Sequence, residues 1–180
     1  MTDAVELIDN KTADARARLT ERLATDPSGV IETLAREHGV TTLEATQMLP
    51  VANCRWVTAS AFADIMGEVT RWGDILFLVH TPNLILECAG PLPPGEFGRG
   101  FFNLHGDSPI GGHINAARCA AIAFVRRPFM GLDSCSIQFF DQDGDAMFKI
   151  FVRRQKDRTL NQAQAKMFET LAARIGTEGR

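Results

Sequence analysis

Histidine is the residue type of this sequence that is best suited to hold a metal. Of the four histidines, His80 follows a short apolar run, His105 ends a Phe-rich run, and His113 follows two glycines. Neutral imidazole is the commonest metal ligand in proteins, and the glycines would let a flat ligand come close to the backbone. A single histidine is also common as a hydrogen-bonded structural residue, so both interpretations stay open. His38 falls at the end of a predicted helix, where the helix dipole favours an imidazolium, and we assign it no function.

Motifs for other chemistries are weak or absent. The four cysteines, at positions 54, 88, 119 and 135, contain no CxxC pair, which predicts free thiols, mostly buried, rather than a zinc site. No GxSxG, HExxH, P-loop or GxGxxG pattern occurs. The absence of tyrosine excludes any tyrosinate ligand. Residues 141–145 lack the glycine and the closing glutamate of a calcium loop, so they predict a turn.

The composition indicates an ordinary globular protein. The 180 residues are 45% hydrophobic and 23% charged, which suits one domain with a small appendage or two small domains. The net charge of −3 argues against a general electrostatic grip on nucleic acid. No apolar run approaches the roughly 18 residues of a membrane span, and the acidic N-terminus lacks the apolar core of a secretory signal. We therefore expect a cytoplasmic protein with neither nucleic acid nor a membrane as its partner.

Residues 1–50 predict a helical arm. Residues 13–24 are good helix formers, and Asp26, followed by proline, offers the cap of a second helix. A capping box at Thr41 predicts a third helix over residues 43–49. Two short helices across a glycine turn also fit a DNA-binding helix-turn-helix, but the second one carries one acid and no base. An arm that packs on the protein or supports a dimer is therefore favoured over a DNA reader.

Residues 51–180 predict an antiparallel sheet with helices before and after it. The apolar periodicity predicts helices over 61–72 and 160–175, strands over 75–79, 84–88, 101–105, 120–125, 135–140 and 146–152, and a loop over 90–100. The fold class is therefore α+β, with a large antiparallel sheet of six or more strands, N-terminal helices and a C-terminal amphipathic helix. Three histidines at strand ends of one such sheet would make a shared site more plausible.

The last hairpin can be analysed by register. A two-residue loop at Asp143-Gly144 places Ile137 and Phe139 opposite Ile150 and Phe148 on a core face. The other face then holds an amide, a cation, two phenylalanines and a methionine, namely Gln138, Lys149, Phe140, Phe151 and Met147. Such a face is typical of a site for an amphipathic ligand with an anionic edge, or of a protomer interface. Both interpretations can hold together.

Residues 71–155 resemble the HutX/ChuX family of intracellular haem-utilisation carriers. The resemblance is carried by WGDILFLVHTPNLILE (72–87), FFNLHG (101–106), GGHI (111–114) and RPFMGLDSCSIQFFDQDGDAMFKIFV (127–152), together with the helix near 160–175. It implies haem as the ligand, a fold like one half of the HemS/ChuS-type haem proteins, and a homodimer that rebuilds the two-half arrangement. The N-terminal 50 residues match the family less clearly.

The resemblance also implies site residues. The functional histidines of the family fall on His80 and His113, which would hold the haem iron, while His105 lies where relatives can carry an arginine and leaves its role open. We prefer His113 as the iron ligand because of its glycines. His80 would be a second axial ligand, a supporting group or a ligand from the other protomer. Lys149, with Gln138 beside it, is our own choice for the haem carboxylates.

Three functions follow, in order of preference. The first is a cytoplasmic haem carrier that takes part in iron acquisition and passes haem on. The second is an oxidative haem-degrading enzyme, which needs an open axial position and a distal donor such as Arg126 or His105. The third is a DNA-binding regulator that uses the N-terminal helices.

Overall fold

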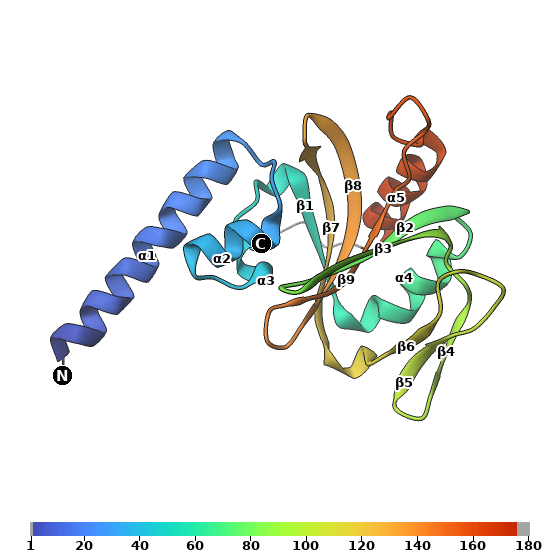
Figure 1. Cartoon of the computed structure of the whole chain (residues 1–180), viewed down its shortest axis with the longest axis horizontal. Coiled ribbons are helices and arrows are strands. Elements are labelled where there is room, and N and C mark those ends of the chain that lie inside the picture. The colour runs from blue at the N-terminus through green and yellow to red at the C-terminus, as the bar shows by residue number, and fades with distance from the viewer. Residues whose placement is uncertain (1, 176–180) are drawn as a thin grey trace.

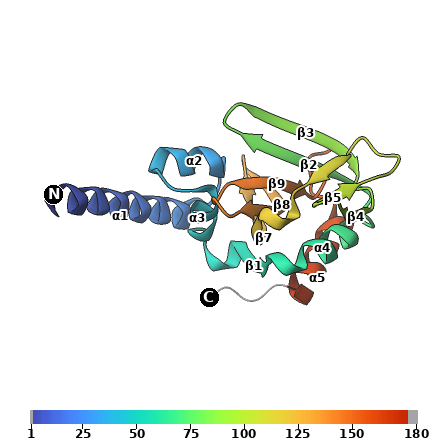
Figure 2. The ribbon, with the colours of Figure 1, turned by 90° about the horizontal axis from the view of Figure 1, so that it is seen from below.

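The computed structural model describes residues 2–175, and their side chains from residue 13 onward. Three helices form the N-terminal arm at one end of the molecule: α1 (Thr2–Thr25), α2 (Ile31–His38) and α3 (Thr42–Gln47). A six-stranded antiparallel sheet follows, and a three-stranded sheet lies at the end away from the arm (Figures 1 and 2). The helices α4 (Phe62–Val69) and α5 (Gln162–Ile175) pack against the large sheet. The predicted α+β class, with N-terminal helices and a C-terminal helix, is confirmed.

The order of strands in the large sheet is β1-β7-β8-β9-β2-β3. Its strands are β1 (Cys54–Thr58), β2 (Asp74–Thr81), β3 (Leu84–Pro91), β7 (Cys119–Phe129), β8 (Leu132–Asp141) and β9 (Ala146–Phe151). The small sheet has the order β4-β5-β6 and consists of β4 (Gly95–Gly98), β5 (Phe101–Leu104) and β6 (Gly112–Ile114). All neighbouring strands pair antiparallel.

One face of the large sheet carries the main hydrophobic core. Side chains alternate between the two faces of a strand, so every second residue of β8 and β9 points to this core. Phe139 and Phe148 stack with ring centroids 4.3 Å apart, and Phe62 of α4 meets both edge-on. Phe168 of α5 closes the core over β7. The predicted core face of the last hairpin is therefore confirmed.

The arm covers part of the opposite face. Leu19, Leu23 and Ile31 of the arm pack in a second hydrophobic cluster with Val125 and Phe140 of the sheet. This cluster explains why the second face of the hairpin is not solvated, because part of it forms the floor on which the arm lies. Burying such side chains stabilises the contact by about 1.5–3 kcal/mol each.

Polar contacts fix the direction in which the arm enters. The Arg127 guanidinium of β7 donates to the backbone carbonyls of Pro27 and Gly29, at 2.7 and 2.8 Å. The predicted capping box is present, since Thr41 and Glu44 each accept a hydrogen bond from the other's backbone amide. At the start of α3, the Leu43 amide donates to the Gly144 carbonyl in the β8–β9 loop. The arm is therefore tied to both ends of the same sheet face.

The last hairpin differs from the prediction at its tip. The Asp141 carboxylate accepts the backbone amides of Asp143 and Asp145, so the loop spans residues 142–145 rather than two residues. A bulge then places Phe140 opposite Ala146 and not opposite Met147. The pairs Ile137–Ile150, Gln138–Lys149 and Phe139–Phe148 stand as predicted.

Four further features differ from the prediction. Asp26 does not cap a helix; its carboxylate accepts the Ser28 amide in a turn, and α2 begins at Ile31 without a side-chain cap. The predicted loop over 90–100 contains β4, where Gly95 lies so close to the Phe102 ring that a Cβ would stand 2.3 Å away. Strand β1 carries no clear alternation and was not predicted. The histidines do not share one sheet, as described below.

The docked arm makes Gly144 a sensitive position. Its φ is +85°, and a Cβ there would lie 2.7 Å from Thr41. Gly144→Ala is therefore expected to lower the free energy of unfolding by about 2–4 kcal/mol, from left-handed strain and overpacking against the arm. Gly131→Ala is the matched control, because its φ is +75° and no atom lies within 4 Å; it should cost only about 1–2 kcal/mol. Urea unfolding measures both, and equal losses would contradict the contact with the arm.

Candidate functional site

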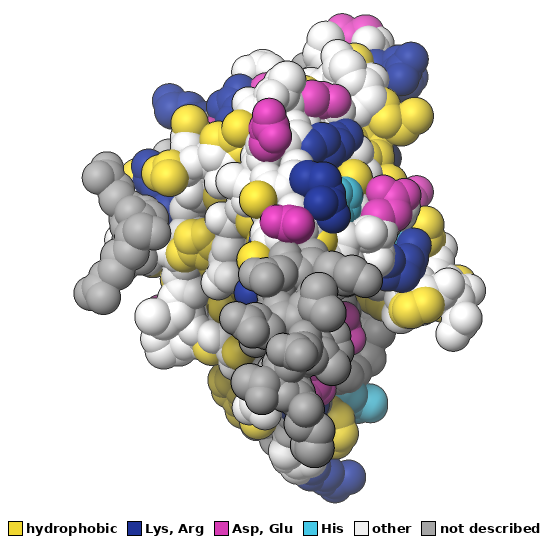
Figure 3. Space-filling view, turned by 90° about the vertical axis from the view of Figure 1, so that its left-hand side faces the viewer, with side chains coloured by type: hydrophobic (Ala, Val, Ile, Leu, Met, Phe, Trp, Pro, Cys, Tyr) yellow, Lys and Arg dark blue, Asp and Glu magenta, His cyan; other side chains and the backbone are white. Residues whose placement is uncertain are grey.

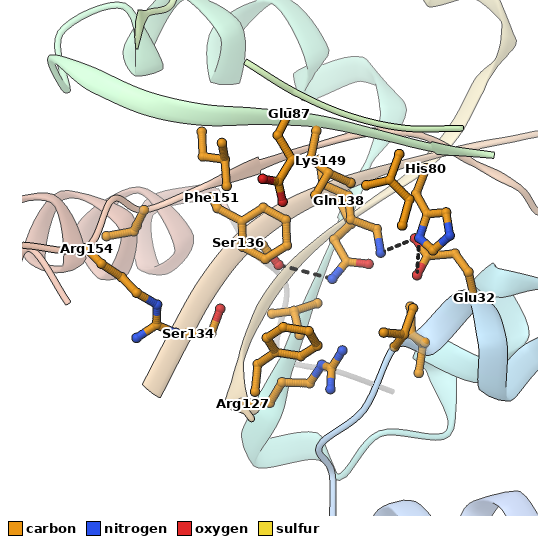
Figure 4. Close-up of a pocket in the computed structure, with 18 of the residues that line it drawn as sticks. Glu32, His80, Glu87, Arg127, Ser134, Ser136, Gln138, Lys149, Phe151 and Arg154 are labelled. Carbon is orange, nitrogen blue, oxygen red and sulfur yellow. Dashed lines mark hydrogen bonds and ion pairs between the residues drawn. The ribbon is translucent and has the colours of Figure 1, made fainter. Parts of the chain in front are cut away.

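A cavity of about 390 Å³ lies between the arm and the second face of the large sheet. Its floor is formed by β7, β8 and β9, one wall by β2 and β3, and the other wall by the start of α2 (Figure 4). The lining residues are Val30, Ile31, Glu32, Leu76, Leu78, His80, Ile85, Glu87, Val125, Arg127, Phe129, Ser134, Ser136, Gln138, Lys149, Phe151, Val152, Arg153 and Arg154. Apolar walls with a few charged groups are typical of small-molecule sites, and the volume lies within their usual range of roughly 300–1,000 Å³.

Strand pairing brings three of the predicted residues together in this cavity. Gln138 of β8 pairs with Lys149 of β9, which in turn pairs with Leu78 of β2. Directly paired residues project from the same face of a sheet, and His80 lies two residues beyond Leu78 on that face. The amide, the ammonium and the imidazole therefore converge because of the register alone.

Glu32 of α2 joins two of these groups (Figure 4). Its Oε1 lies 2.5 Å from Lys149 Nζ, and its Oε2 lies 3.4 Å from His80 Nδ1. Lys149 and Glu32 expose only 6% and 10% of their side chains, so solvent screens the pair weakly. One carboxylate from the arm thus balances a buried cation of the sheet and faces an imidazole of the cavity wall.

Burial and charge act on the pKa values of this pair in opposite directions. Burial by itself would raise the pKa of Glu32, but the Lys149 ammonium and His80 hold that pKa below its usual value. Burial also lowers the pKa of Lys149, and the Glu32 carboxylate opposes that shift. The pair is therefore an ionised one whose two members depend on each other.

Gln138 offers the cavity an unused acceptor. Its Nε2 donates to Ser136 Oγ at 3.1 Å, whereas its buried Oε1 has no hydrogen-bond partner among the described residues. An unsatisfied buried carbonyl costs about 1–3 kcal/mol. A ligand or a water that donates to this oxygen would recover that cost.

His113 and His105 lie outside the cavity. His113 is on β6 of the small sheet, where its ring is exposed and its Nδ1 lies 2.7 Å from Asn103 Oδ1. His105 follows β5 and is also exposed. Space beside Gly112 is open, since nothing lies within 4 Å of its Cβ position. The structure thus brings His80, Gln138 and Lys149 together and places His113 on a different sheet.

Sequence reasoning missed Glu32 and the arginines of the cavity. Glu32 stands beside the apolar stripe of α2, and nothing in its spacing indicates that it reaches a lysine 117 positions later in the chain. Arg127 belongs to a segment that resembles the family, but nothing in the sequence indicates that it both lines the cavity and holds the arm. Arg153 and Arg154 follow β9 and also line the cavity, although a cation after a strand would ordinarily be interpreted as a solvated residue.

The remaining site types have little support. Burial raises the pKa of the Cys54 and Cys135 thiols to about 12 and that of Cys119 to about 11, so these free thiols stay protonated at neutral pH. Over residues 13–175, whose side chains are described, there is no group of three or more His, Cys, Asp or Glu side chains able to hold a metal ion. No described helix is long and apolar enough to cross a membrane.

The buried pair can be tested without any ligand. Glu32→Ala is expected to lower the free energy of unfolding at pH 7 by about 3–5 kcal/mol, because it leaves the Lys149 ammonium buried and uncompensated. Adding Lys149→Met should recover much of that loss. Urea unfolding at several pH values is the measurement.

The pH dependence has a definite sign. A carboxylate whose folded-state pKa is depressed contributes stability above its unfolded pKa, and this contribution is lost as the pH falls through the folded value. The cost of Glu32→Ala should therefore shrink below about pH 4. The same cost at pH 3 as at pH 7, or a double variant as unstable as the single one, would show that the ion pair does not stabilise the docked arm.

The chain is similar to known proteins over the segment that forms most of this cavity. A family model described as haem utilisation ChuX/HutX matches residues 55–171. The intracellular heme transport protein HutX of Vibrio cholerae is 28% identical over 155 residues, which cover 86% of this chain and 80% of HutX. A structure of the heme-binding protein ChuX is 40% identical, covers 87% of this chain and 97% of the ChuX chain, and has a TM-score of 0.80.

A more distant likeness concerns the fold alone. The E. coli heme oxygenase ChuS is 18% identical with a TM-score of 0.67, and the match covers 77% of this chain but 42% of the ChuS chain. The expected fold, like one half of a HemS/ChuS-type protein, is confirmed. Because the family model covers well over half of the sequence, including β2, β8 and β9 of the cavity, this chain belongs to the ChuX/HutX haem utilisation family.

Proposed function

We propose that this chain binds haem in the cytoplasm and passes it to a receiving protein, as part of iron acquisition. The observation that carries the proposal is the convergence of His80, Gln138 and Lys149 in one cavity, within the segment that matches the haem utilisation family. The names of HutX as a heme transport protein and of ChuX as a heme-binding protein support it.

The chemistry of the cavity suits haem. Haem presents a flat apolar ring, an iron at its centre and two carboxylates on one edge. Leu76, Leu78 and Phe151 supply apolar area for a ring, and His80 supplies an imidazole. Lys149 and the Gln138 amide would face the carboxylate edge, and Arg153 and Arg154 supply two further cations to the lining. A haem carboxylate that reaches Lys149 would either bind this ammonium together with Glu32 or displace Glu32 from it.

His80 and His113 are both proposed as iron ligands, and their separation has a consequence. In one protomer they lie on different sheets: His80 of β2 lies beside Glu32 of the arm, whereas His113 belongs to β6 of the small sheet, which lies away from the arm (Figure 1). A site that uses both would take one histidine from each of two protomers. The proposed homodimer would provide this arrangement, and it would rebuild the length of ChuS, of which this chain matches 42%.

An exposed apolar strand favours such a dimer. Strand β3 is an edge of the large sheet, and Leu84, Ile85 and Leu86 on it each expose more than half of their surface. Exposed apolar edges are unusual in monomers and are commonly covered by another chain. We therefore propose β3 as part of the protomer interface.

The haem-degrading alternative finds less support in the positions of its donors. Arg126 is held between Asp133 at 2.7 Å and Glu169 at 2.9 Å, and it does not line the cavity. His105 is exposed outside the cavity as well. Neither of the two residues proposed as distal donors lines the cavity that holds His80, and the carrier function is favoured.

A DNA-binding role also finds little support. Thr42, Ala45 and Thr46 of α3 are buried, so much of that helix is occupied by packing within the protein. Figure 3 views the molecule from the side of the arm, and its coloured basic side chains are interspersed with acidic ones. A nucleic-acid surface needs clustered positive charge.

Haem titration of histidine variants tests the ligand assignment. His80→Ala and His113→Ala are each expected to weaken haem binding and to shift the Soret band, because each removes a proposed iron ligand. His38→Ala is the control, since His38 Nδ1 bonds the Leu34 carbonyl within α2. Absorbance titration of the apoproteins with haemin measures affinity and band position. Equal effects of all three substitutions would contradict the assignment.

The same two variants test the shared site. If each haem takes His80 from one protomer and His113 from the other, mixing the two variants creates dimers in which one of the two sites keeps both histidines. Haem binding should then partly recover on mixing. A mixture that binds no better than its separate components would contradict a shared site.

A further inference from the structure

The outer face of the small sheet holds a polar pair that the cavity does not use. Asn103 of β5 and His113 of β6 are directly paired, so their side chains leave the sheet on the same side. Asn103 Oδ1 lies 2.7 Å from His113 Nδ1. Phe101, on the same face, has its ring centroid 6.1 Å from that of His113 at a tilt of 59°.

The orientation of the Asn103 amide is set by the backbone around it. Its Nδ2 donates to the carbonyl of Gly98 at 3.0 Å, and to those of Glu96 and Phe101 at 3.3 Å. Turning the amide over would place Oδ1 against three carbonyl oxygens, none of which can donate a hydrogen bond. The carboxamide oxygen therefore has to face His113.

This orientation decides which nitrogen of neutral His113 carries the proton. A carboxamide oxygen only accepts hydrogen bonds, so Nδ1 must be the donor. The proton of the neutral ring is then on Nδ1, and the lone pair is on Nε2. No hydrogen-bond partner of Nε2 is present among residues 13–175, and the ring is exposed. Nε2 is thus free to coordinate a metal without a change of tautomer.

We propose that Asn103 is a positioning residue for His113. It holds the ring as the Nδ1–H tautomer, so that Nε2 is left free as the ligand of haem iron. The proposal rests on the proposed function, because haem binding is what gives Nε2 of His113 a metal to coordinate. Metal-bound histidines in general donate their second ring nitrogen to an acceptor that fixes the ring. Here the acceptor is itself fixed, by the β4–β5 hairpin. Glu96, which pairs with Asn103, is the acidic residue next to this pair on the same face.

Asn103→Leu is the first test, since it keeps approximate size and removes the acceptor. It is expected to weaken haemin affinity by about tenfold to a hundredfold, the usual effect of losing such a partner. In the apoprotein, nitrogen NMR of the imidazole should show His113 as the Nδ1–H tautomer in the wild type and a population of the Nε2–H tautomer in the variant. A merely structural role of Asn103 would not change the tautomer.

Asn103→Asp keeps the measurement informative if the leucine variant folds poorly. It retains an acceptor for Nδ1–H, so the tautomer should be retained, whereas its second oxygen faces the three carbonyls that the amide bonds, so its haemin affinity should fall between those of the wild type and Asn103→Leu. Glu96→Gln is the control for a change of charge on the same face and should leave the tautomer unchanged. Asn103→Leu with an unchanged tautomer and an affinity within twofold of wild type would overturn the proposal.

Failure of the proposed function would look different. If the wild type binds no haemin, or if His113→Ala binds it normally, the ligand assignment fails and the task of Asn103 fails with it, whatever tautomer NMR reports. If His113→Ala loses binding but the Asn103 variants do not, the ligand assignment stands and only the positioning role is overturned.

Discussion

The buried ammonium of Lys149 is the constraint on which the cavity depends. Strand alternation places it on the face opposite the hydrophobic core, where it is 5% exposed and only weakly screened by water. A charge in such a place requires a partner, and the partner is Glu32 from another part of the chain. The arm therefore contributes to the site as well as covering the sheet.

The ion pair requires the start of α2 to be held against the sheet. Arg127 binds the backbone just before α2, and this fixes the position from which Glu32 reaches into the cavity. The apolar contacts of the second cluster stabilise the same arrangement. Between these contacts the arm leaves part of the sheet face free, and that part forms the cavity, with Gln138 and Lys149 on its floor and His80 on a wall. A partly covered face suits a carrier, since its ligand must be held and also released.

Features that depend on neighbouring residues could be predicted from the sequence, whereas contacts between residues far apart in the chain could not. The turn signal at Asp143-Gly144 predicted the register of the inner pairs of the last hairpin, and its period-two pattern predicted the core face, because both are local signals. The capping box at Thr41 was likewise a local signal. The bulge at Phe140 was missed, because it depends on how the Asp141 carboxylate folds the loop. Glu32 was missed because its partner lies in another element, and the position of the arm decides the contact.

The histidines illustrate the same limit. Their types and neighbours indicated metal chemistry, and the family resemblance singled out His80 and His113. The expectation of one common sheet was wrong, because β4 forms within a segment interpreted as a loop and pairs with β5, which in turn pairs with β6 in a second sheet. Which histidine shares a site with Lys149 followed only from strand pairing.

The most direct measurement is a haemin titration of the wild-type apoprotein by absorbance, followed by a reductant under air with catalase present. The account predicts saturable growth of a Soret band that stays intact after the reductant is added. No saturable binding would contradict haem as the ligand. Loss of the Soret band with a new bilin-like absorbance would contradict the carrier function and assign the chain to haem degradation.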